Sequence, residues 1–183
     1  MSNQVKQPKA GKAARISLMV VIAALLVTVS YFSSFLDQTD QAIFAAIFTI
    51  GVLAIGTIGS ATLITLIAGV AYSFVSPNLG FIMLLPWLVR GLSTDLILSA
   101  TKTFNGNDLP SAYKVTAAMT ISSFLTGVAQ YFWLIKFLKV IPDNPTIQLL
   151  TVIAIVIAVI STLIVSFLTT KYLFKRIKPV LTW

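Results

Sequence analysis

One uncharged stretch constrains the fold of this chain more than any other feature, because no residue from Ala42 to Val75 carries a charge. As a single helix it would be about 50 Å long, whereas the hydrocarbon core of a bilayer is about 30 Å thick. Gly56-Thr-Ile-Gly-Ser60 offers a break, since glycine permits the backbone conformations that a tight turn needs. The stretch therefore predicts two short helices joined by a turn near or inside the inner membrane surface.

Four further apolar runs have the length of membrane-spanning helices. We expect helices over residues 16–36, 81–101, 111–137 and 146–172, separated by segments that contain Asp, Asn, Gly and Pro. The 183-residue chain is 57% hydrophobic and 10% charged, whereas soluble domains are roughly 45–50% apolar and about 25% charged. The sequence thus predicts an all-α, polytopic membrane protein, a compact bundle of about six transmembrane helices.

Positive charge gathers at the two ends of the chain. Its carriers are Lys6, Lys9, Lys12 and Arg15 before the first apolar run, and Lys171, Lys175, Arg176 and Lys178 after the last one. By the positive-inside rule both termini lie in the cytoplasm of a multi-pass cell-membrane protein, and an even number of helices agrees with this. Lys136 and Lys139, near the expected outer end of the fifth helix, depart from the rule.

The expected organisation is a basic cytoplasmic tail over residues 1–12, a six-helix transmembrane domain over 13–174 and a second basic tail over 175–183. The net charge of +8 is attributed to contact with anionic lipid headgroups. Membrane lipids are therefore expected partners, and nucleic acid is not.

The side chains of most enzyme active sites are missing from this sequence. It contains no cysteine, no histidine and no glutamate, and its acidic residues are Asp37, Asp40, Asp95, Asp108 and Asp143. There is no Gly-x-Ser-x-Gly nucleophile motif and no phosphate-binding Walker lysine. We expect neither an enzyme nor a metal site nor a cofactor, and any coupling to ATP requires a partner protein.

The fourth expected helix carries the most informative polar residue. Arg90 lies roughly 13 Å from the outer end of that helix, where an arginine costs at least ~2.5–3.5 kcal/mol. It must therefore face protein, water or a ligand. Met83, Trp87, Arg90 and Thr94 share one helix face, and an aromatic ring beside a cation suits a planar or anionic solute. The alternative is that Arg90 snorkels or pairs structurally.

Pro86 and Asp95, on the same expected helix as Arg90, lead to two further predictions. Pro86 cannot donate to the carbonyl of Ile82, which is then open to a solute or water. Asp95 lies about 140° around the helix from Arg90, so a direct pair is not expected. Lys114, at a similar depth, is the better partner for Asp95, which we expect to be a structural anchor or a docking contact.

The fifth expected helix offers a second wall for the same site. Thr126, Gln130, Trp133 and Phe137 share one face, and Gln130 needs a hydrogen-bonding partner in hydrocarbon. The predicted substrate-binding residues are thus Met83, Trp87, Arg90, Thr126, Gln130 and Trp133. The alternative for Trp133 and its aromatic neighbours is a belt at headgroup level.

Small residues recur every fourth position in the third expected helix, at Ala61, Thr65, Gly69 and Ser73. Such a stripe lets helices approach closely. Internal packing is the expected role, and a docking face for a partner membrane protein is the alternative.

The chain resembles the substrate-binding S components of energy-coupling factor (ECF) transporters. The resemblance is in the six helices in fewer than 200 residues, the basic tail, the Gly-rich short helix pair, and the sequences AGVAYSFVSPNLG (68–80) and LLPWLVRGLSTD (84–95). It implies a solute-binding subunit for uptake of a vitamin-like micronutrient, working with a transmembrane T component and cytoplasmic ATPases. It also implies a site in the outer half, lined by 37–41, 83–90, 126–133 and the start of the sixth helix.

The resemblance is incomplete at the first helix, where S components dock on the T component through small residues. Here Ala13, Ala14, Ala23 and Ala24 do not form a four-residue repeat. Two other functions stay open: a membrane scaffold, in which Arg90 would pack against Gln130 with no cavity between the last three helices, and a lipid-handling membrane protein. For the solute, Arg90 and the aromatic residues suit a planar, anionic or neutral molecule better than a cationic one.

Overall fold

The computed structural model describes residues 11–32, 39–76, 80–104 and 110–177, and most of these residues are helical. The main helices are α1 (Lys12–Tyr31), α3 (Thr39–Ile55), α4 (Ser60–Val75), α5 (Leu84–Ala100), α6 (Ala112–Tyr131) and α7 (Pro145–Leu168). A 3₁₀ turn, η1 (Gly80–Met83), leads into α5, and π-helical turns follow α6 and α7 as η2 (Phe132–Phe137) and η3 (Thr169–Leu173), with α8 (Phe174–Ile177) last. Asp37, Asp108, the turn at 77–79 and most of both basic tails lie outside the described residues.

The predicted division of the uncharged stretch is confirmed. Helix α3 ends at Ile55 and α4 begins at Ser60. Between them Gly56 has φ 63° and Gly59 has φ 91°, a left-handed conformation that glycine adopts without the clash that a Cβ atom causes. The two glycines therefore reverse the chain within four residues.

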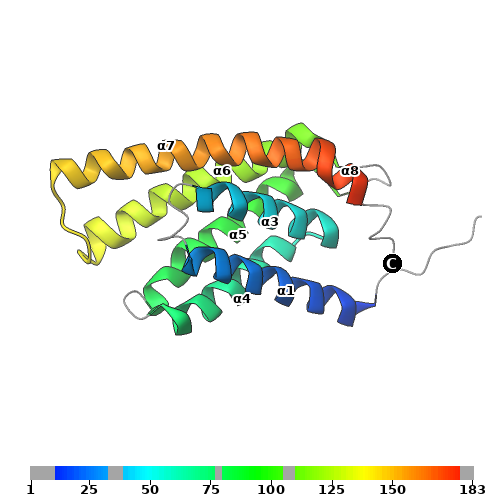
Figure 1. The fold of residues 1–183 in the computed structure, drawn as a ribbon, viewed down its shortest axis with the longest axis horizontal. Coiled ribbons are helices and arrows are strands. Elements are labelled where there is room, and N and C mark those ends of the chain that lie inside the picture. Colours follow the sequence, from blue (N-terminus) through cyan, green and yellow to red (C-terminus); the bar gives the residue numbers. More distant parts are fainter. Residues whose placement is uncertain (1–10, 33–38, 77–79, 105–109, 178–183) are drawn as a thin grey trace, which may run out of the picture.

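The six main helices form a closed ring, since each packs chiefly against two neighbours. Along the ring α1 is followed by α4, α5, α6, α7 and α3, and α3 returns to α1. Figure 1 shows α7 and α6 on one long side and α1 and α4 on the other, with α3 and α5 between them. Fully buried Leu26, Phe48, Ile64, Leu98 and Met119 contribute to the core.

The surface of the bundle is apolar where a soluble protein would be polar. Helix α7 exposes Leu149, Val152 and Ile160 while it buries Thr162 and Ser166 against the rest of the protein. Four helical segments are long and apolar enough to cross a membrane, namely Lys12–Tyr31, Gly80–Ala100, Ala112–Phe137 and Pro145–Arg176. Helices α3 and α4 are apolar but shorter, at 17 and 16 residues. This distribution of polarity is the one that lipid contact requires.

The small-residue stripe of α4 packs inside the protein, as expected. Ala61, Thr65, Gly69 and Ser73 are all buried, and α5 lies against this face. A Cβ atom on Gly69 would lie 3.0 Å from Cβ of Trp87, so the two helices are as close as glycine allows. The alternative of a docking face for a partner is wrong, because α5 covers it.

The two ends of the bundle differ in charge. The beginning of α1, the α3–α4 turn, the end of α5, the beginning of α6, and η3 with α8 lie at one end, whereas the α6–α7 connection lies at the other (Figure 1). The segments at the first end carry Lys12, Arg15, Lys102, Lys114, Lys171, Lys175 and Arg176, and we call it the basic end. Lys136 and Lys139 belong to the segments at the opposite end.

Candidate functional site

A cavity of about 210 Å³ lies in the half of the bundle away from the basic end, because it is lined by the last turns of α1, α4 and α6 and the first turns of α3 and α5. Its lining consists of Val29, Ser30, Asp40, Gln41, Phe44, Tyr72, Met83, Pro86, Trp87, Arg90, Thr126 and Gln130. A second cavity of about 230 Å³ between α6 and α7 shares Gln41, Arg90, Thr126 and Gln130 with it. Arg90 therefore borders both.

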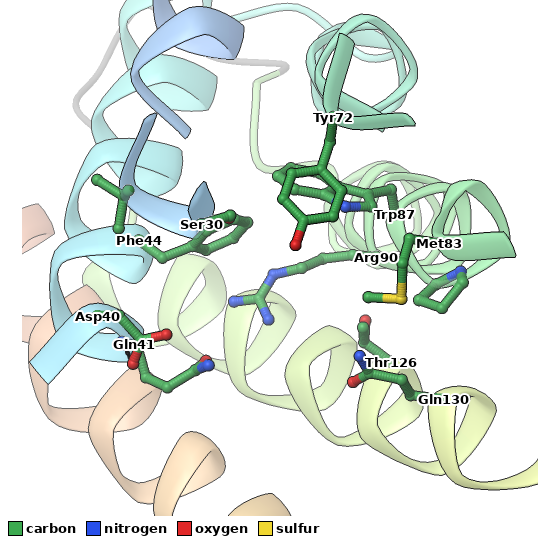
Figure 2. Close-up of a pocket in the computed structure, with 12 residues that line it drawn as sticks. Ser30, Asp40, Gln41, Phe44, Tyr72, Met83, Trp87, Arg90, Thr126 and Gln130 are labelled. Atoms are coloured by element: carbon green, nitrogen blue, oxygen red, sulfur yellow. Dashed lines mark hydrogen bonds between the residues drawn. The ribbon is translucent and has the colours of Figure 1, made fainter. Parts of the chain in front are cut away.

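Arg90 lies at the centre of this site and is only 6% exposed. Figure 2 shows its side chain extending from α5 toward α3, with Tyr72 on one side and Gln41 on the other. Its guanidinium carbon lies 4.9 Å from the ring centre of Phe44 and 5.6 Å from that of Phe48. Both rings offer the guanidinium a cation–π contact in place of water.

The hydrogen bonds of Arg90 are incomplete. Nη1 donates to Oγ of Ser123 at 3.3 Å, and that hydroxyl in turn accepts a hydrogen bond from Thr162 at 3.2 Å. Within the described parts of the chain Nε has no hydrogen-bond partner, and the ion pair there is formed by other residues, Lys136 and Asp143. A buried guanidinium without a carboxylate is a costly arrangement, and it is the kind of feature that marks a binding site in a membrane protein.

The aromatic wall of the cavity comes from three helices. Trp87 on α5 lies 5.4 Å from Phe44 on α3 and 6.0 Å from Tyr72 on α4, measured between ring centres. Met83, one helical turn before Trp87, lines the same cavity. The predicted face of α5 thus presents a sulfur, an indole ring and a cation to one space. The sequence reasoning missed Phe44 and Tyr72, which lie on other helices and become neighbours of Trp87 only through the fold.

Helix α6 provides the polar wall that the sequence predicts. Thr126 and Gln130 both line the cavities, and Figure 2 shows them side by side across from Tyr72. The Thr126 hydroxyl donates to the carbonyl of Ser122 at 2.7 Å, so toward the cavity this oxygen acts as an acceptor. Ser123, which holds Arg90, is a further polar residue of α6 that the sequence reasoning did not single out.

Trp133, the sixth predicted site residue, is not among the residues that line either cavity. Its indole Nε1 donates to the carbonyl of Ile82 at 2.9 Å, and its ring stacks on Phe137 at 5.1 Å between centres. The prediction of a shared face assumed α-helical spacing, but η2 is a π-helix, whose wider turn shifts the register of every residue after Tyr131. The carbonyl of Ile82 therefore already accepts one hydrogen bond from within the protein, from Trp133.

Asp95 has a structural position at the other end of α5. It is 6% exposed and accepts hydrogen bonds from the backbone N–H groups of Ala61 at 3.3 Å and Thr62 at 2.7 Å, and from the Thr62 hydroxyl at 2.6 Å. These groups belong to the first turn of α4, so the carboxylate caps a neighbouring helix. The expected pair with Lys114 is wrong, since Lys114 donates to the carbonyl of Thr101 at 2.9 Å.

An ion pair links the end of η2 to the α6–α7 connection. Nζ of Lys136 donates to Asp143 at 2.6 Å, and the amide of Gln148 donates to the same carboxylate at 2.8 Å. The hydrogen bond from Lys136, followed by that from Gln148, lowers the pKa of Asp143 below its ordinary value. Lys136, an exception to the charge rule in the sequence, thus has its charge balanced locally.

The arrangement around Arg90 offers a buried cation to a bound group. Arginine stays protonated and cannot act as a base, and the lining contains neither a histidine nor a cysteine. In the part of the chain that the structure describes, no three His, Cys, Asp or Glu side chains gather in a way that could hold a metal ion.

Comparisons with protein-family models, curated proteins and solved structures find no match to this chain.

Proposed function

We propose that this protein is the membrane-embedded solute-binding subunit of an uptake transporter for a vitamin-like micronutrient. The observation that carries the proposal is the pair of adjacent cavities around a buried arginine that forms no ion pair with a carboxylate among the described residues. A closed core with a filled centre would have served a purely structural bundle at lower cost.

In the proposed orientation the basic end faces the cytoplasm and the six main helices cross the membrane. The positive-inside rule supports this, since α1 begins and α8 lies at the same basic end. The cavity then opens toward the outer surface, where an imported solute arrives. Helices α3 and α4 are each about 25 Å long, slightly less than a typical hydrocarbon core, so the bilayer thins locally around them.

The proposed partners are a transmembrane T component and cytoplasmic ATPases. The chain has no nucleotide-binding motif of its own, so uptake against a gradient needs energy from elsewhere. The resemblance to ECF S components supports this choice of partners. Ala13 and Ala14 belong to the first turn of α1, which lies at the basic end.

The two alternatives differ in what they require of this site. A scaffold needs Arg90 and Gln130 packed together, whereas here both line open space. A lipid-handling protein finds support in a third, apolar hollow of about 570 Å³ between α6 and α7, lined by Phe124, Phe132 and Leu149 among others. That hollow is on the lipid-facing side of the bundle. Its lining is mainly apolar, with Tyr131 and Gln148 as the polar residues and no charged residue to bind a headgroup, so it weighs less than the Arg90 cavity.

Native mass spectrometry of the full chain, released gently from detergent, tests the proposal. We expect a co-purified small molecule that is retained by the wild type and lost in Arg90→Ala and in Trp87→Ala. Lys136→Met is the matched control, because Lys136 also carries a positive charge but is not part of the cavity lining. A wild-type protein that is empty and binds no member of a vitamin panel would move the function to the scaffold alternative.

Coupling to partners is tested separately by uptake in cells. The chain is co-expressed with a T component and ATPases, and accumulation of the solute identified by mass spectrometry is measured. Accumulation is expected only when the ATPases hydrolyse ATP, and accumulation by this chain alone would show that the partners are not needed.

A further inference from the structure

We propose that the solute is a small monocarboxylate with a planar or apolar body, and that its carboxylate binds Arg90. This inference rests on the proposed function and adds the chemical class of the substrate. Four observations carry it: the state of Arg90, the charges that line the cavities, the aromatic wall and the cavity volume.

The state of Arg90 indicates an anionic ligand. The guanidinium is almost completely buried, donates to one neutral hydroxyl, and has an Nε without a partner within the described residues. Phe44 and Phe48 lie within cation–π distance, but an aromatic ring accepts no strong hydrogen bond. A carboxylate would supply the missing acceptors in a bidentate, charge-assisted arrangement, which is stronger where water is excluded.

The charges that line the cavities indicate a single negative charge on the ligand. Among the residues lining the two cavities, Arg90 is the positively charged one and Asp40 the negatively charged one. A phosphate ester carries about two negative charges, and the second would have no cation while Asp40 would repel it. A monocarboxylate matches the one cation and tolerates the carboxylate on α3.

The aromatic wall of the first cavity indicates that the rest of the ligand is flat or apolar. Rings of Phe44, Tyr72 and Trp87 and the sulfur of Met83 line one side of the first cavity. Flat or apolar groups gain most from such a surface, by burial and by ring stacking. The volume of about 210 Å³ is below the roughly 300–1,000 Å³ of sites for drug-sized ligands, so one ring or two fused rings fit.

Two further polar groups are placed to complete the carboxylate site. Figure 2 shows the Tyr72 hydroxyl directed toward the side chain of Arg90, and Gln130 on the opposite side of the cavity. Both can donate hydrogen bonds. Thr126 cannot, because its proton is already given to Ser122.

Binding of two matched triplets to the full chain in detergent tests the inference. The probes are benzoate, benzamide and benzylamine, and indole-3-acetate, indole-3-acetamide and tryptamine, with affinities measured by calorimetry. We expect the carboxylate of at least one triplet to bind at least about tenfold more tightly than its amide, because a charged hydrogen bond contributes about 1.5–3 kcal/mol and 1.4 kcal/mol is tenfold. The amines should not bind, and inorganic phosphate should not compete.

Variants tie the preference to Arg90. Arg90→Lys keeps the charge but loses the two-pronged geometry, so carboxylate affinity should fall about tenfold, and Arg90→Met should abolish it. Lys136→Met should change nothing. If Arg90→Met does not fold, two single variants, Arg90→Lys and Ser123→Ala, decide the question. Ser123→Ala removes the hydroxyl that accepts from the guanidinium. Each variant should alter the affinity for the carboxylate and leave any affinity for the amide unchanged.

The outcomes separate this inference from the proposed function. Equal binding of amide and carboxylate, tighter binding of an amine, competition by phosphate, or carboxylate affinity that survives Arg90→Met overturns the monocarboxylate assignment. If a neutral or cationic solute then co-purifies in the cavity, the proposed function still stands. If no solute of any charge binds, both fall.

Discussion

At the residue scale, the chemistry of this protein is concentrated in two charged side chains on α5 that have opposite uses. Asp95 has its hydrogen bonds filled by the first turn of α4, whereas Arg90 has two aromatic rings and one hydroxyl. A buried charge whose hydrogen bonds are all made stabilises the fold, whereas a buried charge with few hydrogen bonds costs stability. Their separation of five residues puts them on different faces of the helix, which is why they do not neutralise each other.

Removing the charge of Arg90 should stabilise the protein in the absence of solute. Arg90→Met keeps the volume and removes a buried charge, and replacing buried ionic groups by apolar ones is often stabilising by about 1–4 kcal/mol. We expect a higher midpoint of thermal unfolding in detergent, together with loss of solute binding. Such a trade-off is typical of functional sites. A lower midpoint would mean that the contacts with Phe44 and Phe48 hold α3 in place, and that Arg90 is structural.

Removing the charge of Asp95 should instead destabilise the protein. Asp95→Asn retains one acceptor oxygen but loses the charged cap on α4, at a cost of about 1–3 kcal/mol. The midpoint of thermal unfolding should therefore fall. Asp143→Asn is the control, because Asp143 is an exposed carboxylate that caps no buried helix. Equal midpoints for the two variants would contradict the capping role.

At the element scale, the position of the site depends on how closely α4 and α5 approach. A Cβ atom on Gly91 would lie 2.7 Å from Cα of Thr62 and 2.8 Å from the carbonyl oxygen of Ala61, both of them backbone atoms of α4. Neither can rotate away as a side chain does. This contact keeps Trp87 beside Tyr72 and brings Asp95 within reach of the first turn of α4.

Gly91→Ala should force the two helices apart. Overpacking of this kind costs about 1–3 kcal/mol, and solute affinity should fall with stability because Trp87 and Arg90 move with α5. Gly51→Ala is the matched control, since its nearest contact is Cγ2 of Ile22 at 2.6 Å, a side-chain atom rather than backbone, and neither residue lines a cavity. Thermal unfolding and calorimetry check both effects, and similar losses in the two variants would show that the backbone contact is not decisive.

The connection between α6 and α7 should lose part of its stability in acid. Because the folded pKa of Asp143 is lowered, its stabilising contribution is fully present above the unfolded value of about 3.9 and is lost as the pH falls through the folded value. The difference in unfolding midpoint between wild type and Asp143→Asn should be constant from pH 7 to 5, begin to shrink near the unfolded value of about 3.9, and vanish only below the lowered folded pKa. A difference that persists at low pH would mean that the charge is not its source.

At the scale of the whole molecule, the ring of six helices encloses a cavity that lies toward one end of the bundle. Helix α3 closes the ring by packing on both α1 and α7, and its first turns bring Asp40, Gln41 and Phe44 to the cavity. The cavity therefore lies in the half of the molecule away from the basic end.

The orientation can be tested because the chain contains no cysteine. Val140→Cys lies in the α6–α7 connection, Ser111→Cys just before α6 and Ile58→Cys in the α3–α4 turn. A membrane-impermeant maleimide should label Val140→Cys on intact cells, and the other two only after permeabilisation. Labelling of Ile58→Cys from outside would show that α3 and α4 do not cross the membrane, and reversed labelling of all three would turn the cavity toward the cytoplasm.

Patterns along the chain were sufficient to predict much of this protein. Apolar length and glycine position predicted the helices and the break at Gly56–Ser60, because the cost of an unpaired backbone in hydrocarbon leaves few options. Spacing on α5 and α6 also predicted that Met83, Trp87, Arg90, Thr126 and Gln130 lie around one space, since a regular helix converts sequence separation into direction. Whether they bind a solute remains a prediction.

Contacts between distant segments were decided by the tertiary structure alone. The partners of Arg90 on α3 and of Asp95 on α4 depend on which helices become neighbours in the ring, and one-dimensional spacing carries no such information. Trp133 lies in a π-helical turn, lines neither cavity and donates to the Ile82 carbonyl, none of which its spacing along the chain predicted. The sequence by itself determined where the helices begin, break and bear charge, since these follow from local solvation and backbone geometry. Tertiary packing decided which buried charge has its hydrogen bonds satisfied and which does not, because only the closed ring sets the distances between side chains on different helices.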